Sequence, residues 1–210
     1  MKVIVTGGAG FIGSHLVDKL LSLKFEVIVL DNLSTGRHQN LDRIKDKIKF
    51  VECNIDLSGD WTNNFEGVDW VIHLAALADI VPSIQKPESY FKSNVTGTFN
   101  VLRASQLSGV KRLVYVASSS CYGEPDLFPT PESAEIRPQY PYALTKYLGE
   151  ELIIHWAQVY KLPGLSLRLF NVYGPRSLAS SSYSSVISVF LKQKKKNRSL
   201  TIVGDGLQTR

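Results

Sequence analysis

The stretch Thr6-Gly7-Gly8-Ala9-Gly10-Phe11-Ile12-Gly13 decides the fold of this chain. It follows the apolar run Val3–Val5, which is typical of a buried strand, and it opens the amphipathic stretch Ile12–Leu23, which is typical of a helix. Glycines permit a tight turn and let the backbone approach a pyrophosphate with no side chain in between. Free N–H groups at the start of the helix would then bind the phosphates. This order of strand, turn and helix predicts a dinucleotide site.

An acidic residue at the end of the second expected strand supports the same interpretation. Asp31 could accept hydrogen bonds from both ribose hydroxyls of NAD, and it would repel the 2′-phosphate of NADP. The plainer alternative is a tight turn that binds no ligand, with an aspartate that caps a helix. The dinucleotide interpretation is favoured because strand, turn, helix and acid follow one another in the required order, and NAD is the expected cofactor.

Short apolar runs alternate with amphipathic stretches along most of the chain. The runs are rich in Val, Ile and Leu and lack a strict polar alternation, as expected when both faces of a parallel sheet are covered. The pattern predicts an α/β fold, a doubly wound parallel-sheet Rossmann fold. The expected strands are Val3–Val5, Val27–Leu30, Ile48–Val51, Trp70–Leu74, Leu113–Ala117 and Leu165–Phe170, and the expected helices are Ile12–Leu23, Ser89–Leu107 and Pro141–Tyr160.

A tyrosine and a lysine stand four residues apart at the start of the last of these helices. Tyr142 and Lys146 therefore share one helix face. A phenol has a reference pKa of about 10, and a nearby ammonium together with an oxidised nicotinamide would lower it. Tyr142 could then remove a proton from a substrate hydroxyl, and Ser118, at the carboxyl end of a strand, could bind the same oxygen. The alternative is that Tyr142 and Lys146 simply lie on an exposed helix face. The catalytic interpretation is favoured because Ser118 and the glycine turn occur in the same sequence.

Composition limits the other classes of function. The chain has 210 residues, of which 44% are hydrophobic, and its two cysteines, Cys53 and Cys121, favour a reducing compartment. The net charge of +5 is carried by one run from Lys192 to Arg198, so no nucleic-acid partner is expected. The sequence shows no signal segment or membrane span, and we expect a cytoplasmic protein. No metal site is expected, His73 is expected to be a hydrogen-bonded structural residue, and Cys121 a packed thiol.

The chain resembles a known family through a set of motifs that spans it. It is similar to the extended short-chain dehydrogenase/reductase family, and within it to the NAD-dependent nucleotide-sugar epimerases and dehydratases of the UDP-glucose 4-epimerase-like kind. Beyond the glycine turn, the motifs are Asp31-Asn32-Leu33, His73-Leu74-Ala75-Ala76, Asn94-Val95-Thr96-Gly97-Thr98, Ser118-Ser119-Ser120-Cys121-Tyr122-Gly123, Tyr142 through Lys146, and Leu167-Arg168-Leu169-Phe170-Asn171-Val172-Tyr173-Gly174-Pro175.

The resemblance implies a role for particular residues. Asn54 stands where the family usually has an aspartate near the adenine, and an amide can make a similar bond. The implied catalytic residues are Ser118, Tyr142 and Lys146, and the implied substrate contacts are Ser118, Ser119, Tyr142, Asn171 and Arg210. The implied cofactor contacts are Gly7, Gly10, Phe11, Ile12, Gly13, Asp31, Asn32, Asn54, Ile55, Leu74, Ala75, Ala76, Asn94, Tyr142, Lys146 and Phe170.

The residues after Ser118 help to choose the reaction. Family members that eliminate water carry an acid and a base there, whereas Ser119 and Ser120 cannot do that proton transfer. Members with serines at these positions look like the 4-epimerases, so the resemblance implies epimerisation of a nucleoside-diphosphate sugar by transient oxidation at C4 with tightly bound NAD. The alternatives are a dehydratase, decarboxylase or reductase of the same family, or a non-catalytic NAD-binding regulatory protein. The complete set of Ser118, Tyr142 and Lys146 argues against the last.

The pattern changes after Asn171, where Gly174-Pro175 and a serine-rich stretch follow. We expect a NAD-binding Rossmann domain over residues 1–172 and the start of a substrate-binding lobe over 173–210, with a short strand at Leu200–Val203. The ending resembles a family motif in which the arginine, here Arg210, grips the substrate's diphosphate. The resemblance implies further residues beyond it, so this chain is expected to bind NAD with little turnover. The expected partners are the nucleoside-diphosphate sugar and a second copy in a homodimer.

Overall fold

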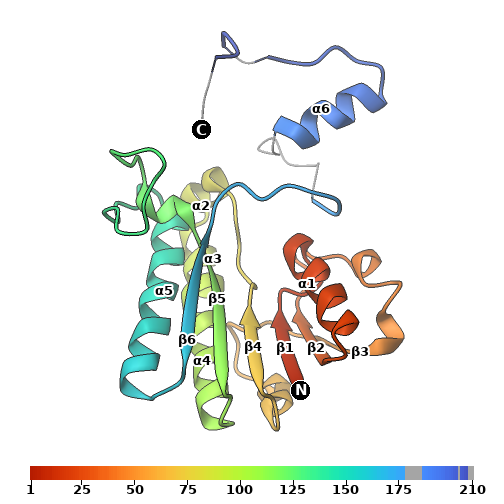
Figure 1. Ribbon diagram of the computed structural model, residues 1–210, viewed down its shortest axis with the longest axis vertical. Helices are drawn as coiled ribbons and strands as arrows, with labels where there is room; N and C mark the ends of the chain where they lie inside the picture. Colours follow the sequence, from red (N-terminus) through yellow and green to blue (C-terminus); the bar gives the residue numbers. More distant parts are fainter. Residues whose placement is uncertain (178–185, 203, 208–210) are drawn as a thin grey trace. The chain divides into compact units, whose positions relative to one another are not determined.

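The computed structural model describes residues 1–177, 186–202 and 204–207. A six-stranded parallel sheet forms the centre of the unit Met1–Phe170 (Figure 1). The strands are β1 (Lys2–Thr6), β2 (Glu26–Asp31), β3 (Ile48–Glu52), β4 (Trp70–His73), β5 (Arg112–Ser118) and β6 (Gly164–Leu169). Their order is β3-β2-β1-β4-β5-β6, and every neighbouring pair is parallel. The order reverses between β1 and β4, which is where ligands bind in open sheets of this kind. The predicted doubly wound fold is confirmed.

The helices agree closely with the sequence pattern. They are α1 (Phe11–Ser22), α2 (Ile80–Gln85), α3 (Pro87–Phe91), α4 (Gly97–Leu107), α5 (Pro141–Val159) and α6 (Val186–Lys195), with the π-helix η4 (Lys92–Thr96) and the 3₁₀ helices η1 (His38–Asn40), η2 (Lys45–Lys47), η3 (Asp60–Phe65) and η5 (Ser119–Tyr122). The single helix expected over Ser89–Leu107 is α3, η4 and α4 in succession. The short helix α2 was not anticipated.

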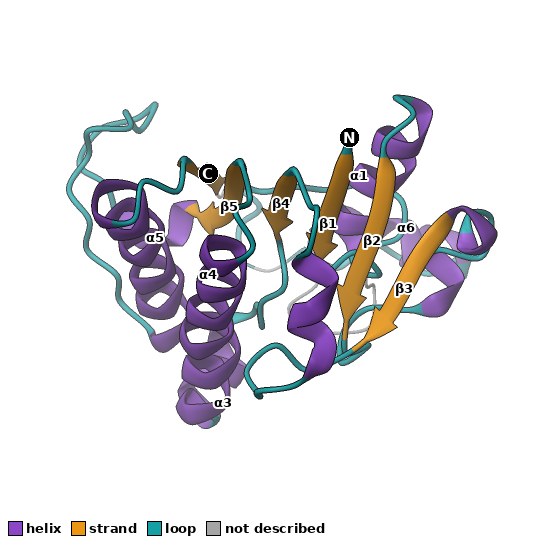
Figure 2. Ribbon diagram, turned by 90° about the horizontal axis from the view of Figure 1, so that it is seen from below, coloured by secondary structure: helices purple, strands orange, loops and turns teal. Residues whose placement is uncertain are grey.

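Two hydrophobic layers cover the sheet, one on each face. Alternate residues of β1 point to opposite sides, as in any strand. Ile4 packs in the cluster that includes Val101 of α4 and Ile153 of α5, whereas Val5 packs in the cluster that includes Val17 of α1. Figure 2 shows α4 and α5 on one face of the sheet and α1 on the other. The carboxyl ends of the strands are thereby left to carry the loops that form the site.

The chain divides into two compact units, Met1–Phe170 and Asn171–Arg210. The domain boundary expected after residue 172 stays a prediction. The strand expected at Leu200–Val203 is wrong for Leu200 to Ile202, and Val203 lies outside the described residues. A strand must pair its backbone with a neighbour. Here Thr201 N instead donates to Gln193 Oε1 at 3.1 Å, and Gln193 Nε2 donates to Thr201 Oγ1 at 2.7 Å.

Candidate cofactor and catalytic site

A pocket of about 410 Å³ lies at the carboxyl ends of the central strands. It brings together most of the cofactor contacts expected from the sequence, namely Gly7, Gly10, Phe11, Ile12, Gly13, Asp31, Asn32, Asn54, Ile55, Leu74, Ala75 and Ala76. Its remaining lining residues were missed by the sequence reasoning: Leu30, Ser34, Thr35, Cys53, Asp56, Leu77, Ser89, Lys92, Ser93 and Val116. Many of these residues are direct neighbours in sequence of a motif residue, and this adjacency could have identified them as lining residues of the pocket.

The glycine turn is packed so tightly that larger residues would not fit. Gly7 has φ +70°, and a Cβ there would lie 2.7 Å from Ala75 N. A Cβ on Gly8 would lie 2.7 Å from Val29 Cγ1, and one on Gly13 would collide with the carbonyl oxygen of Gly7. Gly10 caps α1 without a side-chain hydrogen bond, and the first turn of α1 contains no acidic residue. The start of α1 therefore suits an anionic group, and the turn fits a dinucleotide's pyrophosphate.

Asp31 is held in place by backbone hydrogen bonds. Its side chain accepts from Ala9 N at 2.9 Å and from Leu33 N at 2.8 Å, and only 7% of the residue is exposed. Burial raises the pKa of this carboxyl, while the two backbone hydrogen bonds act to lower it. Each carboxylate oxygen has a second acceptor site, so Asp31 keeps capacity for ribose hydroxyls. A Cβ on Gly36 would lie 2.7 Å from Asp31 Oδ1, so the following loop packs closely on it.

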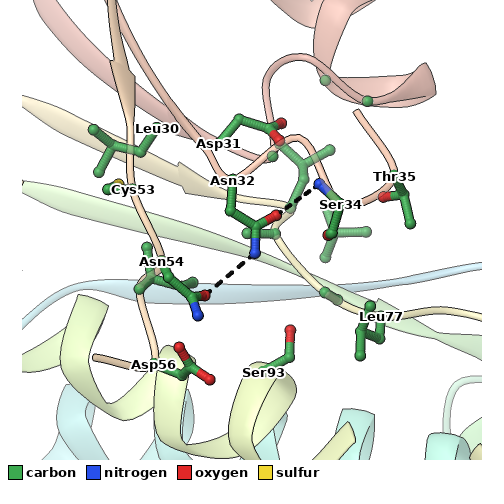
Figure 3. Close-up of a pocket in the computed structure, with 18 of the residues that line it drawn as sticks. Leu30, Asp31, Asn32, Ser34, Thr35, Cys53, Asn54, Asp56, Leu77 and Ser93 are labelled. Atoms are coloured by element: carbon green, nitrogen blue, oxygen red, sulfur yellow. Dashed lines mark hydrogen bonds between the residues drawn. The ribbon is translucent and has the colours of Figure 1, made fainter. Parts of the chain in front are cut away.

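Two asparagines connect the next strand ends across the pocket. Asn32 Nδ2 donates to Asn54 Oδ1 at 3.2 Å, and Ser34 N donates to Asn32 Oδ1 at 3.0 Å (Figure 3). Asn32 follows β2 and Asn54 follows β3. The amide pair thus links the carboxyl ends of two neighbouring strands at the wall of the pocket.

Ser118 and Tyr142 lie close together, one at the end of β5 and the other in α5. Ser118 ends β5 and caps η5, where its Oγ accepts from Ser120 N at 3.2 Å and from Ser120 Oγ at 2.8 Å. Burial is the largest influence on Tyr142 and raises its pKa, whereas the nearby Ser118 side chain acts to lower it. The lowering expected from an ammonium together with an oxidised nicotinamide stays a prediction, and it would have to outweigh this desolvation of the phenol.

Lys146 is almost completely buried, at 3% exposed. Burial lowers the pKa of its ammonium to about 7, while Cys121 and Glu150 act to raise it. Its Nζ lies 4.3 Å from the centroid of the Tyr115 ring, a cation–π distance. The loss of hydration is thus partly offset by the ring, and the lysine is placed to change protonation near neutral pH.

Several expected contacts do not line the pocket: Asn94, Tyr142, Lys146 and Phe170. Asn94 is 1% exposed and bridges two segments, since it accepts from Leu77 N at 2.8 Å and donates to Thr145 Oγ1 at 3.0 Å. Phe170 is exposed, with its ring 6.3 Å from that of Tyr122.

The expected substrate contacts are dispersed. Ser119 begins η5 directly after Ser118. Asn171 belongs to the second compact unit and is exposed. Arg210 and most of the serine-rich stretch lie outside the described residues. The described residues therefore bring together most of the expected cofactor contacts, whereas the catalytic roles of Ser118, Tyr142 and Lys146 and all the substrate contacts stay predictions.

His73 is a structural residue, as expected. It is fully buried, with Nδ1 2.6 Å from Thr6 Oγ1 and Nε2 2.9 Å from Thr98 Oγ1. Burial lowers its pKa to about 3, so the ring is neutral at physiological pH. Cys121 is likewise a packed thiol, whose Sγ donates to the carbonyl oxygen of Ala143 at 3.7 Å.

The described residues contain neither a membrane-spanning helix nor a metal-binding cluster. No helix there is long and apolar enough to cross a bilayer. Across residues 1–177, 186–202 and 204–207, no cluster of three or more His, Cys, Asp or Glu side chains has a metal-binding arrangement.

Comparison with known proteins agrees with this geometry. A UDP-glucose 4-epimerase of Mycolicibacterium smegmatis is 37% identical over 216 residues, covering 100% of this chain and 68% of that protein. The structure of a UDP-N-acetylglucosamine 4-epimerase from Methanobrevibacter ruminantium, in complex with UDP-N-acetylmuramic acid, superposes with a TM-score of 0.94 at 35% identity, covering 99% of this chain and 66% of that one. A dTDP-glucose 4,6-dehydratase from Streptomyces venezuelae, with NAD bound, gives 0.89 at 32% identity, covering 98% and 66%.

The chain thus spans about two thirds of the length of these relatives. The model of the NAD dependent epimerase/dehydratase family matches residues 3–210, nearly the whole chain. Fold, pocket and comparisons agree that this chain belongs to the NAD dependent epimerase/dehydratase family and that its cofactor is NAD.

Proposed function

We propose that the protein is a 4-epimerase of a nucleoside-diphosphate sugar that works by transient oxidation at C4 with tightly bound NAD. The observation that carries this proposal is that Ser118 at the end of β5 lies close to Tyr142, which is one helical turn from buried Lys146 in α5. A protein that only bound NAD would have no use for such a pair. The names of the relatives support the same reaction.

The residues of the pocket fit the cofactor. The glycine turn and the start of α1 would hold the pyrophosphate, and Asp31 would accept hydrogen bonds from the adenosine ribose. When bound, NAD supplies the reversible two-electron oxidation of the sugar carbon. Asp31 would oppose a 2′-phosphate, which favours NAD over NADP.

The side chains of this chain would transfer the proton of the sugar's 4-hydroxyl and stabilise the negative charge that forms on the phenol. Tyr142, as phenolate, removes the proton from the sugar's 4-hydroxyl, and Ser118 donates a hydrogen bond to the same oxygen. The C4–O bond becomes a carbonyl, the keto sugar presents its opposite face, and Tyr142 returns the proton as the carbonyl is reduced. The ammonium of Lys146 favours the phenolate by its positive charge. Sugar and cofactor end in their starting oxidation states.

The segment after Ser118 favours epimerisation over dehydration. Elimination of water requires an acid and a base near the sugar. Ser119 and Ser120 carry neither, and the hydroxyl of Ser120 already donates to Ser118 Oγ at 2.8 Å. Dehydration stays the second candidate because a dehydratase is among the structural relatives.

The test is direct. The protein expressed from its complete gene, loaded with NAD, would be incubated with UDP- and dTDP-sugars and followed by proton NMR. Inversion at C4 without loss of water is expected for at least one sugar. A 4-keto-6-deoxy product would establish the dehydratase instead, and binding of NAD with no conversion of any sugar would favour a regulatory protein. We further propose a homodimer, which is argued below from the surface of α4 and α5.

A further inference from the structure

A buried ion pair joins the helix that carries Tyr142 and Lys146 to the edge strand of the sheet. Glu150 follows Lys146 by four residues, so all three side chains leave α5 on one face. The Glu150 side chain is 3% exposed, and its Oε1 lies 2.5 Å from Arg168 Nη2. Ser166 Oγ donates to Glu150 Oε2 at 2.7 Å. Both carboxylate oxygens are thus occupied by β6.

Arg168 connects more than these two elements. Its Nε donates to both Glu150 oxygens at 3.1 Å, and its Nη1 donates to Tyr122 Oη at 2.8 Å. Nη1 also donates to the carbonyl oxygen of Glu132 at 3.3 Å, and the guanidinium carbon lies 4.8 Å from the centroid of the Tyr122 ring. One planar side chain therefore contacts α5, η5 and the segment that leads from η5 to α5.

These contacts hold both ends of the segment that contains Ser118. Tyr122 is the last residue of η5 and is 3% exposed. At the other end, Ala117 is the register partner of Arg168 in the pairing of β5 with β6. Displacement of the Arg168 side chain would release Tyr122, and with it the support for Ser118 opposite Tyr142.

Charge provides a second connection, through Lys146. The groups that face the buried ammonium are the Tyr115 ring, Cys121, His73 and Glu150. His73 is neutral and burial raises the pKa of the Cys121 thiol, so Glu150 supplies the negative charge among them. Glu150 raises the pKa of Lys146, whereas burial lowers it.

We propose that the Glu150–Arg168 ion pair positions the active site: Arg168 holds the Ser118 segment against α5, and Glu150, one helical turn from Lys146, influences the protonation of the Lys146 amine. The inference rests on the proposed function in taking Ser118, Tyr142 and Lys146 as the working groups. Neither Glu150 nor Arg168 touches the reacting atoms. An ion pair with a purely structural role would stabilise the fold and leave the protonation of Lys146 unchanged.

The first test follows Lys146 itself, by NMR titration of its ¹³Cε signal, assigned with Lys146→Arg. Glu150→Gln leaves the guanidinium uncompensated, so the titration midpoint should fall by roughly one pH unit. Arg168→Met leaves the carboxylate uncompensated, so the midpoint should rise. The matched control is Asp126→Asn, which breaks the exposed ion pair between Asp126 and Arg137 and should leave the midpoint unchanged.

The opposite signs make this test decisive. Thermal unfolding followed by circular dichroism would show which variants are folded, and either folded variant suffices. An unchanged midpoint, or shifts of the same sign in both variants, would overturn the electrostatic half of the proposal.

The second test is kinetic and uses Tyr122→Phe, which retains both charges and removes the hydroxyl that Arg168 contacts. Affinity for NAD should not change, while kcat should fall roughly tenfold because Ser118 is less well placed. An unchanged kcat would refute the positioning role. If the wild-type protein expressed from its complete gene has no epimerase turnover, the proposed function fails, and the Lys146 titration alone then decides the inference.

Discussion

Asp31 and Tyr142 are the single residues on which the proposed cofactor preference and proton transfer depend, and each is constrained by its immediate surroundings. The carboxylate of Asp31 accepts two backbone N–H groups, which fixes its direction. The phenol of Tyr142 lies close to Ser118 in a mostly buried position, where burial raises its pKa. Both residues are thus oriented by the fold before any ligand binds, and such preorganisation reduces the cost of binding and reaction.

Replacement of Asp31 by asparagine should weaken the binding of NAD and reduce the preference for NAD over NADP. Because the charged acceptor for the ribose hydroxyls is lost, the affinity for NAD should fall roughly ten- to hundredfold. The repulsion of the 2′-phosphate of NADP is removed at the same time. Calorimetric titration with NAD and NADP would measure both effects, with the exposed Asp46→Asn as the control. Tighter binding of NADP than of NAD by the wild-type chain would contradict the argument, and Arg37 would then be the candidate phosphate contact.

Tyr142→Phe should retain NAD and lose most of the turnover. Removal of a general acid–base group costs roughly 10²–10⁴-fold in rate, whereas the ring still fills its place. Steady-state rates with the accepted sugar nucleotide, together with NAD titration, would separate the two properties. Tyr140→Phe, just before α5, is the control and should behave as wild type. Undiminished turnover in Tyr142→Phe would assign the proton transfer to another group.

At the scale of elements, His73 links β4 to two neighbours. Thr6 at the end of β1 and Thr98 in α4 hold its two ring nitrogens, and the ring is fully buried. The strand that precedes the Leu74-Ala75-Ala76 wall of the pocket is thereby connected to elements on both sides. Protonation of the ring would bury a charge.

His73 should therefore make stability depend on pH. Its pKa in the folded state is lowered to about 3, so between that value and the unfolded value near 6.5 the unfolded chain binds more protons. Stability should fall as the pH falls through this window, by at most about 1.4 kcal/mol per unit.

Urea denaturation from pH 7 to pH 4 would measure the effect of His73→Gln. The variant should be less stable at pH 7 yet show a flatter pH dependence, so that the two curves converge on acidification. The exposed His155→Gln should retain the wild-type slope. Parallel curves for wild type and His73→Gln would show that His73 does not carry the pH dependence.

At the scale of the whole molecule, the surface of α4 and α5 carries more apolar side chains than a solvent-facing surface needs. The exposed examples on these helices are Phe99, Leu107, Leu144, Ile154 and Val159. Clusters of this kind mark association surfaces more often than isolated apolar residues do. The face is the basis of the proposed homodimer.

Ile154→Glu should shift the protein from dimer to monomer, because a charge at an apolar interface would lose its hydration. Light scattering over a range of concentrations would give the mass. Leu127→Glu, which changes an equally apolar and exposed side chain in the segment between η5 and α5, should leave the mass unchanged. A wild-type protein that is monomeric at every concentration would contradict the proposal.

Much of the fold and of the cofactor site followed from the sequence alone, because those features depend on local spacing. The glycine turn between a strand and a helix, the acid at the next strand end, and Tyr142 four residues before Lys146 are short-range patterns, and backbone geometry translates them directly into positions. The six strands and the long helices agree with the apolar periodicity to within about two residues for the same reason.

Other properties depend on which distant segments meet, and only the tertiary structure decided them. The spacing of Tyr142 and Lys146 says nothing of their burial, which raises the pKa of one and lowers that of the other. Nor does any local pattern join Glu150 to Arg168 and Tyr122, or turn Asn94 toward Thr145. Desolvation, and hydrogen bonds between residues far apart in sequence, arise only when the chain has folded, and they determine the electrostatics of Tyr142 and Lys146.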